Sequence, residues 1–231
     1  MSPVIVAIHQ PQYLPYLGFF HKLAQCDVFV VLDDVQFQKN GLQNRNKIKT
    51  CKGWQWLTVP VLQRADQTIK EVRLNPQTRW SRKHWSALVT NYSKAPFFAL
   101  YGDSIREILQ AEHEYLGSLD MALVRFCAQA LGIETPMTMS SELKVGPGKT
   151  QRLVNICQAL NADTYLSGPG GKRYMEMELF ERAGLTVKFQ EFTSPVYAQQ
   201  FADQGFLPNL SVLDALFCCG PEARALIGLD A

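Results

Sequence analysis

The sequence predicts an α/β fold with a Rossmann-like, mostly parallel sheet and flanking helices. Two short runs of consecutive apolar residues, 4–8 and 28–32, are typical of parallel strands that are buried on both faces. Residues 17–24 lie between them with the apolar spacing of a short helix, so the three segments predict a right-handed βαβ unit. A second strand–helix–strand order between residues 164 and 192 predicts a further part of the sheet.

The middle of the chain separates these two parts. Residues 36–52 are polar and basic, and Asn40 before Gly41 predicts a turn. Strand character returns over residues 54–61, and residues 68–74 alternate like a half-exposed strand. Apolar residues at helical spacing then predict a helical insertion over about residues 80–135. The remaining elements are expected as helices over residues 150–160, 176–183 and 209–217 and as strands over residues 164–166 and 186–192.

Length and composition indicate a single α/β domain over residues 1–231. Hydrophobic residues make up 47% of the chain and charged residues 19%, which excludes a disordered or fibrous protein. No apolar run approaches the roughly 18 to 20 residues that span a bilayer, and polar His9 ends the first run too early for a signal peptide. The six cysteines form no Cys-x-x-Cys pair, which predicts free thiols and no metal site. We therefore expect a cytoplasmic protein without a membrane segment.

Basic residues are concentrated in one stretch, residues 35–94. The whole chain has a formal net charge of 23 − 21 = +2. The stretch has twelve basic and two acidic residues and so carries 12 − 2 = +10, which leaves 2 − 10 = −8 for the remainder. Flat rings can stack on a sugar or a base while cations hold phosphates, so we expect an anionic partner. The alternative is a solvated basic face over core tryptophans. The stretch includes all four tryptophans, Trp54, Trp56, Trp80 and Trp85.

Polar residues follow the first two predicted strands. Ligands of open parallel sheets collect where strands end and helices begin, which is the place of His9 and Gln10. A histidine there can act as a general acid or base or donate to a phosphate, and Gln12 extends the same rigid polar turn. The alternative for His9 is a loop histidine bonded to the backbone. No G-x-G-x-x-G follows the first strand, so neither NAD nor FAD is expected.

Asp33 and Asp34 end the second predicted strand and are further candidates for a catalytic role. An acidic residue at this place can accept hydrogen bonds from a ribose, and a pair of carboxylates can hold Mg²⁺. The alternative is an aspartate that forms a turn or caps a helix. Mg²⁺ and ATP therefore stay open as cofactors, and no metal-ligand set is assigned.

Two further groups of residues suit a phosphorylated ligand such as a nucleotide-sugar. Amides and cations without a nearby acid follow one another between Asn44 and Lys49, although an exposed hairpin would have a similar sequence. Glycine-rich loops precede two predicted helices, and their backbone N–H groups can cradle anions together with a lysine. Neither loop is a P-loop, and simple turns are the alternative. The candidates are Asn44, Arg45, Asn46 and Lys47 in the first group and Lys149, Ser167, Gly168, Gly170 and Lys172 in the loops.

Several polar motifs together resemble the WbqC-like family of bacterial proteins from about residue 4 to residue 220. The resemblance implies a connection with O-antigen, lipopolysaccharide or other surface-polysaccharide gene clusters and the transfer of glycine or another aminoacyl group to a sugar. It also adds Gln36 to the candidate substrate contacts. The motifs are His9-Gln10-Pro11-Gln12-Tyr13-Leu14-Pro15, Gly18-Phe19-Phe20-His21-Lys22, Asp33-Asp34-Val35-Gln36, Asn44-Arg45-Asn46, Tyr165-Leu166-Ser167-Gly168 and Pro208-Asn209-Leu210-Ser211.

Three functional hypotheses follow. The first is a transferase in which basic residues and glycine loops hold phosphates, a tryptophan supports the sugar ring and His9 removes the acceptor proton; aminoacyl-tRNA is a possible donor. The second is an ATP-dependent enzyme that adenylates a carboxylate, similar to nucleotidyltransferases. Those enzymes carry His-x-Gly-His in the first loop, whereas residues 14–18 here contain no histidine. The third is a noncatalytic module that binds nucleotide-sugar or RNA.

Overall fold

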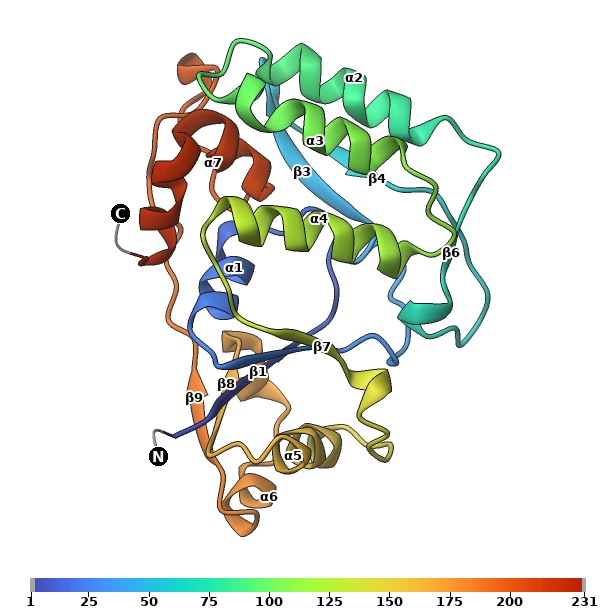
Figure 1. Ribbon diagram of the computed structural model, residues 1–231, viewed down its shortest axis with the longest axis vertical. Coiled ribbons are helices and arrows are strands. Elements are labelled where there is room, and N and C mark those ends of the chain that lie inside the picture. The colour runs from blue at the N-terminus through green and yellow to red at the C-terminus, as the bar shows by residue number, and fades with distance from the viewer. Residues whose placement is uncertain (1–2, 230–231) are drawn as a thin grey trace. The chain divides into compact units, whose positions relative to one another are not determined.

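The computed structural model describes residues 3–229 (Figure 1). Residues 1, 2, 230 and 231, which the single-domain prediction includes, lie outside the described residues. The chain forms two compact units. Unit 1 contains residues 3–10, His21–Asp34 and Glu134–Thr193, and unit 2 contains Pro11–Phe20, Val35–Ile133 and the residues from Ser194 onward. None of the helices in the described range is both long enough and apolar enough to span a bilayer.

Unit 1 is built on a five-stranded parallel sheet, which confirms the predicted fold class. Its strands are β1 (Ile5–His9), β2 (Val28–Val31), β7 (Met137–Met139), β8 (Thr164–Ser167) and β9 (Thr186–Phe189). Their order across the sheet is β7-β2-β1-β8-β9, and every pair is parallel. Ala7 in the centre of β1 pairs with Phe29 on one side and Leu166 on the other. β1 is therefore the central strand.

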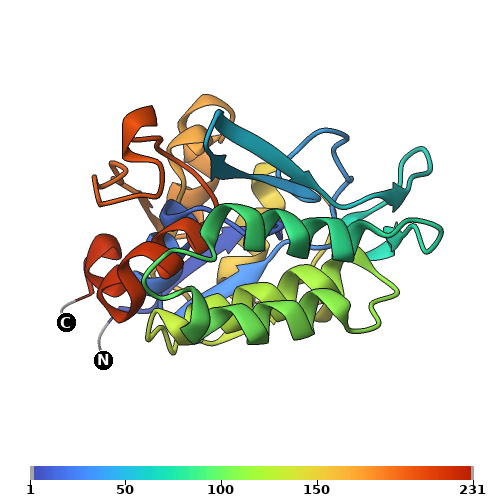
Figure 2. The ribbon, with the colours of Figure 1, turned by 90° about the horizontal axis from the view of Figure 1, so that it is seen from above.

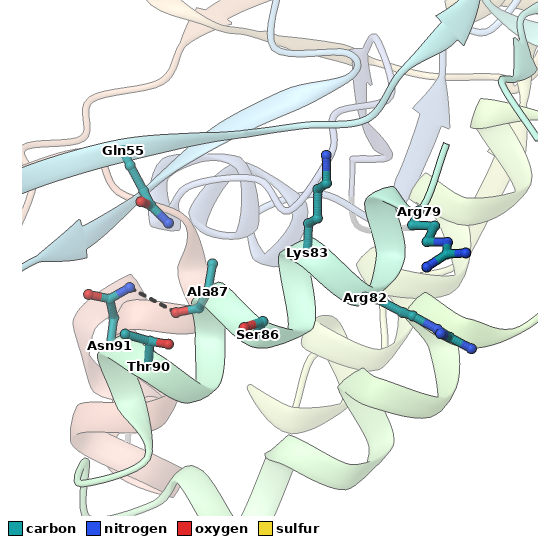
Figure 3. Close-up of a pocket in the computed structure, with 8 residues that line it drawn as sticks. All are labelled: Gln55, Arg79, Arg82, Lys83, Ser86, Ala87, Thr90 and Asn91. Carbon is teal, nitrogen blue, oxygen red and sulfur yellow. Dashed lines mark hydrogen bonds between the residues drawn. The ribbon is translucent and has the colours of Figure 1, made fainter. Parts of the chain in front are cut away.

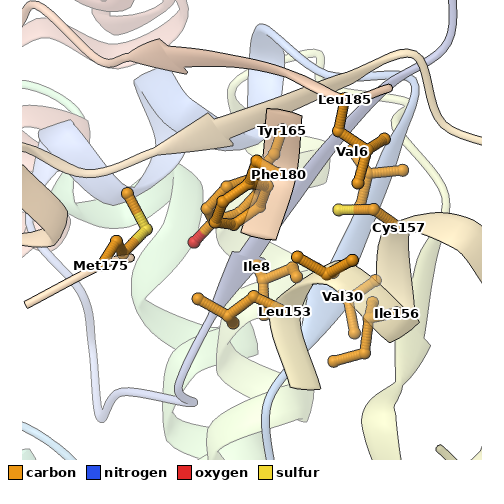
Figure 4. Close-up of a cluster of buried hydrophobic side chains, with 11 residues drawn as sticks. Val6, Ile8, Val30, Leu153, Ile156, Cys157, Tyr165, Met175, Phe180 and Leu185 are labelled. Atoms are coloured by element: carbon orange, nitrogen blue, oxygen red, sulfur yellow. The ribbon is translucent and has the colours of Figure 1, made fainter. Parts of the chain in front are cut away.

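The core of unit 1 lies between this sheet and the helices α5 (Thr150–Ala159) and α6 (Met177–Arg182). Apolar residues recur at helical spacing in both helices, so each helix presents an apolar face to the sheet, as predicted. The rings of Tyr165 and Phe180 stack with their centroids 5.4 Å apart (Figure 4). The cluster of buried side chains is Val6, Ile8, Val30, Leu153, Val154, Ile156, Cys157, Tyr165, Met175, Phe180 and Leu185.

Unit 2 combines helices with an antiparallel hairpin. The helices α2 (Trp80–Tyr92), α3 (Phe98–Gln110) and α4 (Leu116–Ala130) lie where helical spacing predicted them and run side by side in Figure 2. The hairpin consists of β3 (Arg45–Thr50) and β4 (Gly53–Thr58). A second, short hairpin pairs β5 (Val61–Leu62) with β6 (Arg73–Leu74). The last α-helix is α7 (Val212–Cys219), and α1 (Leu17–Ala24) begins in unit 2 and ends in unit 1.

Several local elements differ from the predictions or were not predicted. The polar segment 36–52 contains strand β3, whose Ile48 is fully buried although its neighbours are cations. Residues 68–74 do not form one strand, because Thr68 and Glu71 form a capping box that starts a 3₁₀ turn over Ile69–Glu71. Strand β7 was not predicted. Helix α7 begins at Val212 rather than at residue 209, since the side chain of Ser211 caps it by accepting from the N–H of Leu213.

Candidate functional site

The strand order of unit 1 creates a reversal point beside β1. The chain runs from β1 to β2 on one side of the sheet and from β8 to β9 on the other, so the loops after β1 and β8 diverge between two neighbouring strands. Ligands of open parallel sheets bind at such a point, outside the carboxyl ends of the strands. The loops bring His9 and Gln10 to one sheet edge with Ser167 and Gly168. We define these four residues as the switch-point cluster.

His9 is partly buried and ends strand β1. Its Nδ1 donates a hydrogen bond to the carbonyl oxygen of Gln10 at 2.9 Å, so the neutral ring carries its lone pair on Nε2. Burial and the positive charge of Lys22 lower the pKa of His9 to about 4, and the bond to Gln10 only partly opposes this shift. The imidazole is therefore neutral at neutral pH and can accept a proton through Nε2.

Lys22 of α1 is a member of this region that the sequence alone does not indicate. Its Nζ donates to the carbonyl oxygen of Ile8 at 2.7 Å, and only 2% of the residue is exposed. Burial lowers the pKa of this amine to about 8. Lys22 ends one of the family motifs, Gly18-Phe19-Phe20-His21-Lys22, but a cation among the apolar residues of a short helix usually indicates a surface position. Lys22 thus places a positive charge next to His9.

Asp33 and Asp34 are held by residues from two later segments of unit 1. The Asp33 carboxylate accepts from Ser141 N at 3.0 Å, Ser141 Oγ at 2.8 Å and Ser140 Oγ at 3.0 Å. Asp34 accepts from Ser140 Oγ at 2.5 Å and forms an ion pair with Arg152 of α5. These oxygens already have strong donors, so the pair does not favour a Mg²⁺ ion. The catalytic role of the two aspartates stays a prediction.

The glycine loop after β8 leads into a 3₁₀ turn over Pro169–Arg173. A larger residue is disfavoured at Gly171, because a Cβ atom there would overlap with Ser167 Oγ and lie 3.0 Å from Met175 Cε. A Cβ at Gly168 or Gly170 would meet nothing within 4 Å, so both backbones are open to an approaching ligand. Lys172 lies with its Nζ 4.9 Å from the centre of the Phe189 ring. The contact of this loop with an anion stays a prediction.

The other glycine loop precedes α5. Lys149 occupies the N-cap position of the helix and is exposed. The neighbouring Thr150 is buried, and its hydroxyl accepts a hydrogen bond from the N–H of Glu176 at 3.2 Å. Thr150 therefore connects the start of α5 with Glu176, the residue before α6.

Three of the four amides among the candidate residues of unit 2 donate hydrogen bonds within the protein. Asn46 Nδ2 donates to the carbonyl oxygen of Leu14 at 2.6 Å, and Leu14 has a φ of 45°. This bond stabilises the loop around Leu14 in a strained conformation. Asn44 Nδ2 donates to Val59 O at 2.8 Å, and exposed Gln36 donates to Asp66 at 3.2 Å. Gln12 is buried, and its Oε1 has no hydrogen-bond partner among the described residues.

The cationic candidates of unit 2 lie on one face of the β3–β4 hairpin. Arg45 stacks over the Trp56 ring at 4.3 Å, and Lys47 Nζ lies 5.1 Å from the centre of the Trp54 ring. Both tryptophans are exposed, at 47% for Trp54 and 37% for Trp56. Trp80, in contrast, is buried. The two hairpin tryptophans are therefore exposed enough to stack on a ligand.

Unit 2 also contains a buried polar network that the sequence did not predict. Asp214 accepts hydrogen bonds from the hydroxyls of Tyr92 at 2.7 Å and Tyr197 at 2.8 Å. Burial raises the pKa of Asp214. Lys49 is 1% exposed and donates through Nζ to Gly205 O at 2.6 Å. No short-range pattern joins these residues, because they come from distant segments of the chain.

Comparisons with known proteins add the family context. Residues 10–226 match the model of the WbqC-like protein family. The chain is 38% identical over 222 residues to the uncharacterized protein Rv1507c of Mycobacterium tuberculosis (strain ATCC 25618 / H37Rv), and the match covers 94% of this chain and 95% of that protein. No solved structure matches.

Proposed function

The chain belongs to the WbqC-like protein family, and we propose that it is a cytoplasmic transferase that moves a glycyl, other aminoacyl or small acyl group onto an activated sugar. The sugar would be a phosphorylated precursor, such as a nucleotide-sugar, for O-antigen, lipopolysaccharide or another surface polysaccharide. The observation that carries this proposal is the position of His9, at the end of the central strand β1 and at the reversal point of the sheet. A base at the place where such folds bind ligands suits removal of a proton from an acceptor amine or hydroxyl.

The proposed step uses the residues of unit 1. The acceptor nitrogen or oxygen forms a bond to the acyl carbon, His9 Nε2 takes the acceptor proton, and the bond between the acyl carbon and its donor breaks. His9 then returns the proton to the leaving group. The backbone at Gly168 and Gly170, with Lys172, would hold the phosphates of the sugar precursor. Burial, together with the cation of Lys22, keeps the His9 imidazole neutral at neutral pH and makes it a weak base that readily gives the proton up again.

The adenylation hypothesis has less support from the geometry. It would place Mg²⁺ at Asp33 and Asp34, whose oxygens accept from two serines and pair with Arg152. Exchange between ATP and pyrophosphate across a panel of amino acids separates the two reactions. Exchange that depends on one amino acid would favour adenylation, and its absence would favour a preactivated donor.

The proposal is tested by mass spectrometry of the sugar product. Purified protein is incubated with candidate nucleotide-sugars and glycyl donors, and we expect the mass of the sugar to rise by one aminoacyl residue. His9→Gln should abolish this product without weakening nucleotide-sugar binding. His113→Gln is the matched control, because His113 lies after α3 in unit 2, where its Nε2 donates to the carbonyl oxygen of Ile108. Equal product from the wild type and His9→Gln would refute the role of His9, and binding without any mass gain would favour the noncatalytic module.

A further inference from the structure

One face of helix α2 is polar and basic apart from Ala87. Arg79 precedes the helix, and the following positions on this face recur at spacings of three and four residues, which places them on one side. They line a shallow cavity of about 500 Å³ opposite Gln55 of β4, and no acidic residue within residues 3–229 lines it (Figure 3). In the figure Gln55 points from β4 toward α2, and Lys83 points from α2 toward the hairpin. The lining residues on this face are Arg79, Arg82, Lys83, Ser86, Ala87, Thr90 and Asn91.

The cations of this face have no neutralising partner. In the described part of the chain, Arg79, Arg82 and Lys83 form no ion pair, and the first turn of α2 contains no acidic residue. The start of a helix carries a partial positive charge, so three cations there repel it and one another. Binding of an anion would remove this repulsion. Cations at the start of a helix are electrostatically unfavourable, and residues that break such a local rule often have a function.

The opposite face of β4 presents the exposed tryptophans. Successive side chains of a strand point to opposite faces, so Gln55 faces the α2 cavity while Trp54 and Trp56 face away from it. The two rings meet edge to face with centroids 5.5 Å apart, and Lys47 and Arg45 lie over them. β4 pairs with β3 alone among the described strands, so its outer edge is uncovered by a further strand. The edge of β4 therefore lies between basic groups on one face of the hairpin and exposed rings on the other.

We propose that the edge of β4 and the adjoining face of α2 form a binding surface for single-stranded RNA. The phosphates would lie along Arg79, Arg82 and Lys83, and bases would stack on Trp54 and Trp56. A single strand can bend around the strand edge to reach both faces, whereas a stiff duplex cannot. The hydroxyls of Ser86 and Thr90 can hydrogen-bond the 2′-hydroxyls that distinguish RNA from DNA, and so can the amide of Asn91, although its Nδ2 already donates to Ala87 O at 2.8 Å. The surface is independent of the proposed transferase site, because every residue that forms it lies in unit 2.

The test is fluorescence anisotropy of the full-length protein with a labelled single-stranded RNA of roughly 15 nucleotides. Trp54→Ala should raise the Kd about fivefold or more, the effect expected when a base loses one aromatic partner. The double variant Arg82→Glu/Lys83→Glu should raise the Kd at least about tenfold. It should also make the slope of log K against log salt shallower by about 1.4, since each lost phosphate contact with a single strand contributes about 0.7.

A matched control has the same change in net charge in unit 1. Arg182→Glu/Lys188→Glu alters two exposed cations of α6 and β9 and should leave the Kd within about twofold. Circular dichroism and thermal melting verify that all variants are folded. An equal loss of binding in the control pair would overturn the proposal, because it would show binding to the overall charge. Three other results would overturn the proposal as well. The first is tighter binding of the matching duplex than of the single strand, and the second is competition by inorganic polyphosphate as strong as that by unlabelled RNA. The third is binding to anionic phospholipid vesicles but not to RNA.

The result can be separated from the outcome of the transferase assay. His9→Gln should bind the RNA with the wild-type Kd, since His9 belongs to unit 1 and to a different proposed role. If His9→Gln loses product but not RNA binding, both proposals are supported. If RNA binding fails in the wild type while product forms, only the RNA surface is refuted.

Discussion

The ion pair between Arg152 and Asp34 provides the sharpest test of whether Asp34 has a structural role. Only 12% of the Arg152 side chain and 16% of the Asp34 side chain are exposed. Removing one member of a buried ion pair typically costs about 3–5 kcal/mol, because the other charge stays buried without a partner. Some exposure remains and Ser140 still donates to Asp34, so we expect Arg152→Met to lower the free energy of unfolding by about 3 kcal/mol. For a chain of this size that corresponds to a fall in Tm of about 6–12 °C.

The measurement is denaturant unfolding of a double-mutant cycle. Asp34→Asn should cost a similar amount, and the double variant Asp34→Asn/Arg152→Met should cost at least about 1.5 kcal/mol less than the sum of the single variants. Arg182→Met is the control, because its ion pair with Glu178 is exposed and should contribute less than about 0.5 kcal/mol. If Arg152→Met unfolds like the wild type, or if Asp34→Asn loses transferase product while keeping full stability, the structural interpretation of Asp34 is wrong.

Three further predictions concern stability. Burial lowers the pKa of His84 to about 4, so between pH 6.5 and 4 the unfolded chain binds more protons than the folded one, and the free energy of unfolding decreases as the pH is lowered. His84→Gln should make this decrease smaller by about 3 kcal/mol when unfolding is measured across that pH range. Gly171→Ala should lower Tm by several degrees, and Ser167→Ala in the same chain should restore part of it, because the Oγ that the new Cβ would overlap is gone; no restoration in thermal melts would contradict this steric account. Tyr92→Phe should cost about 1.5–3 kcal/mol in urea unfolding, since it removes the 2.7 Å hydrogen bond to buried Asp214; a cost below about 0.5 kcal/mol would show that this bond is dispensable.

The parallel sheet could be predicted because its strands are continuous apolar runs. β1 and β2 are buried on both faces, and short runs of this kind seldom form surface elements in a chain of this length. β3 could not be predicted in the same way, because cations alternate with its buried side chains. Its Lys47 lies over an exposed ring, and its Ile48 packs inside. The alternation is present in the sequence, but a polar alternation is also typical of a loop.

The candidate site was predictable only where position along the chain determines position in the fold. The rule that ligands bind at the carboxyl ends of parallel strands led to His9 and Ser167 before their strands were known to be neighbours. The ion pair of Asp34 is formed with Arg152, which is 118 residues away along the chain, so no local sequence pattern could predict it. Lys22 was missed because a lysine in a short helix is ordinarily at the surface, and its burial follows from the packing of α1 on the end of β1.

The two proposals can be joined by one comparison of donors. If the RNA surface of unit 2 serves the reaction of unit 1, charge reversal at Arg82 and Lys83 should lower the rate of transfer from an aminoacyl-tRNA donor at subsaturating concentration. The same variant should leave transfer from a small activated acyl donor unchanged, because that donor offers no chain of phosphates to the basic face of α2. His9→Gln should abolish transfer from both donors, since removal of the acceptor proton is common to both reactions. If the variant at Arg82 and Lys83 slows transfer from both donors equally, the basic face supports the sugar substrate or the fold. RNA binding would then have no role in the choice of donor.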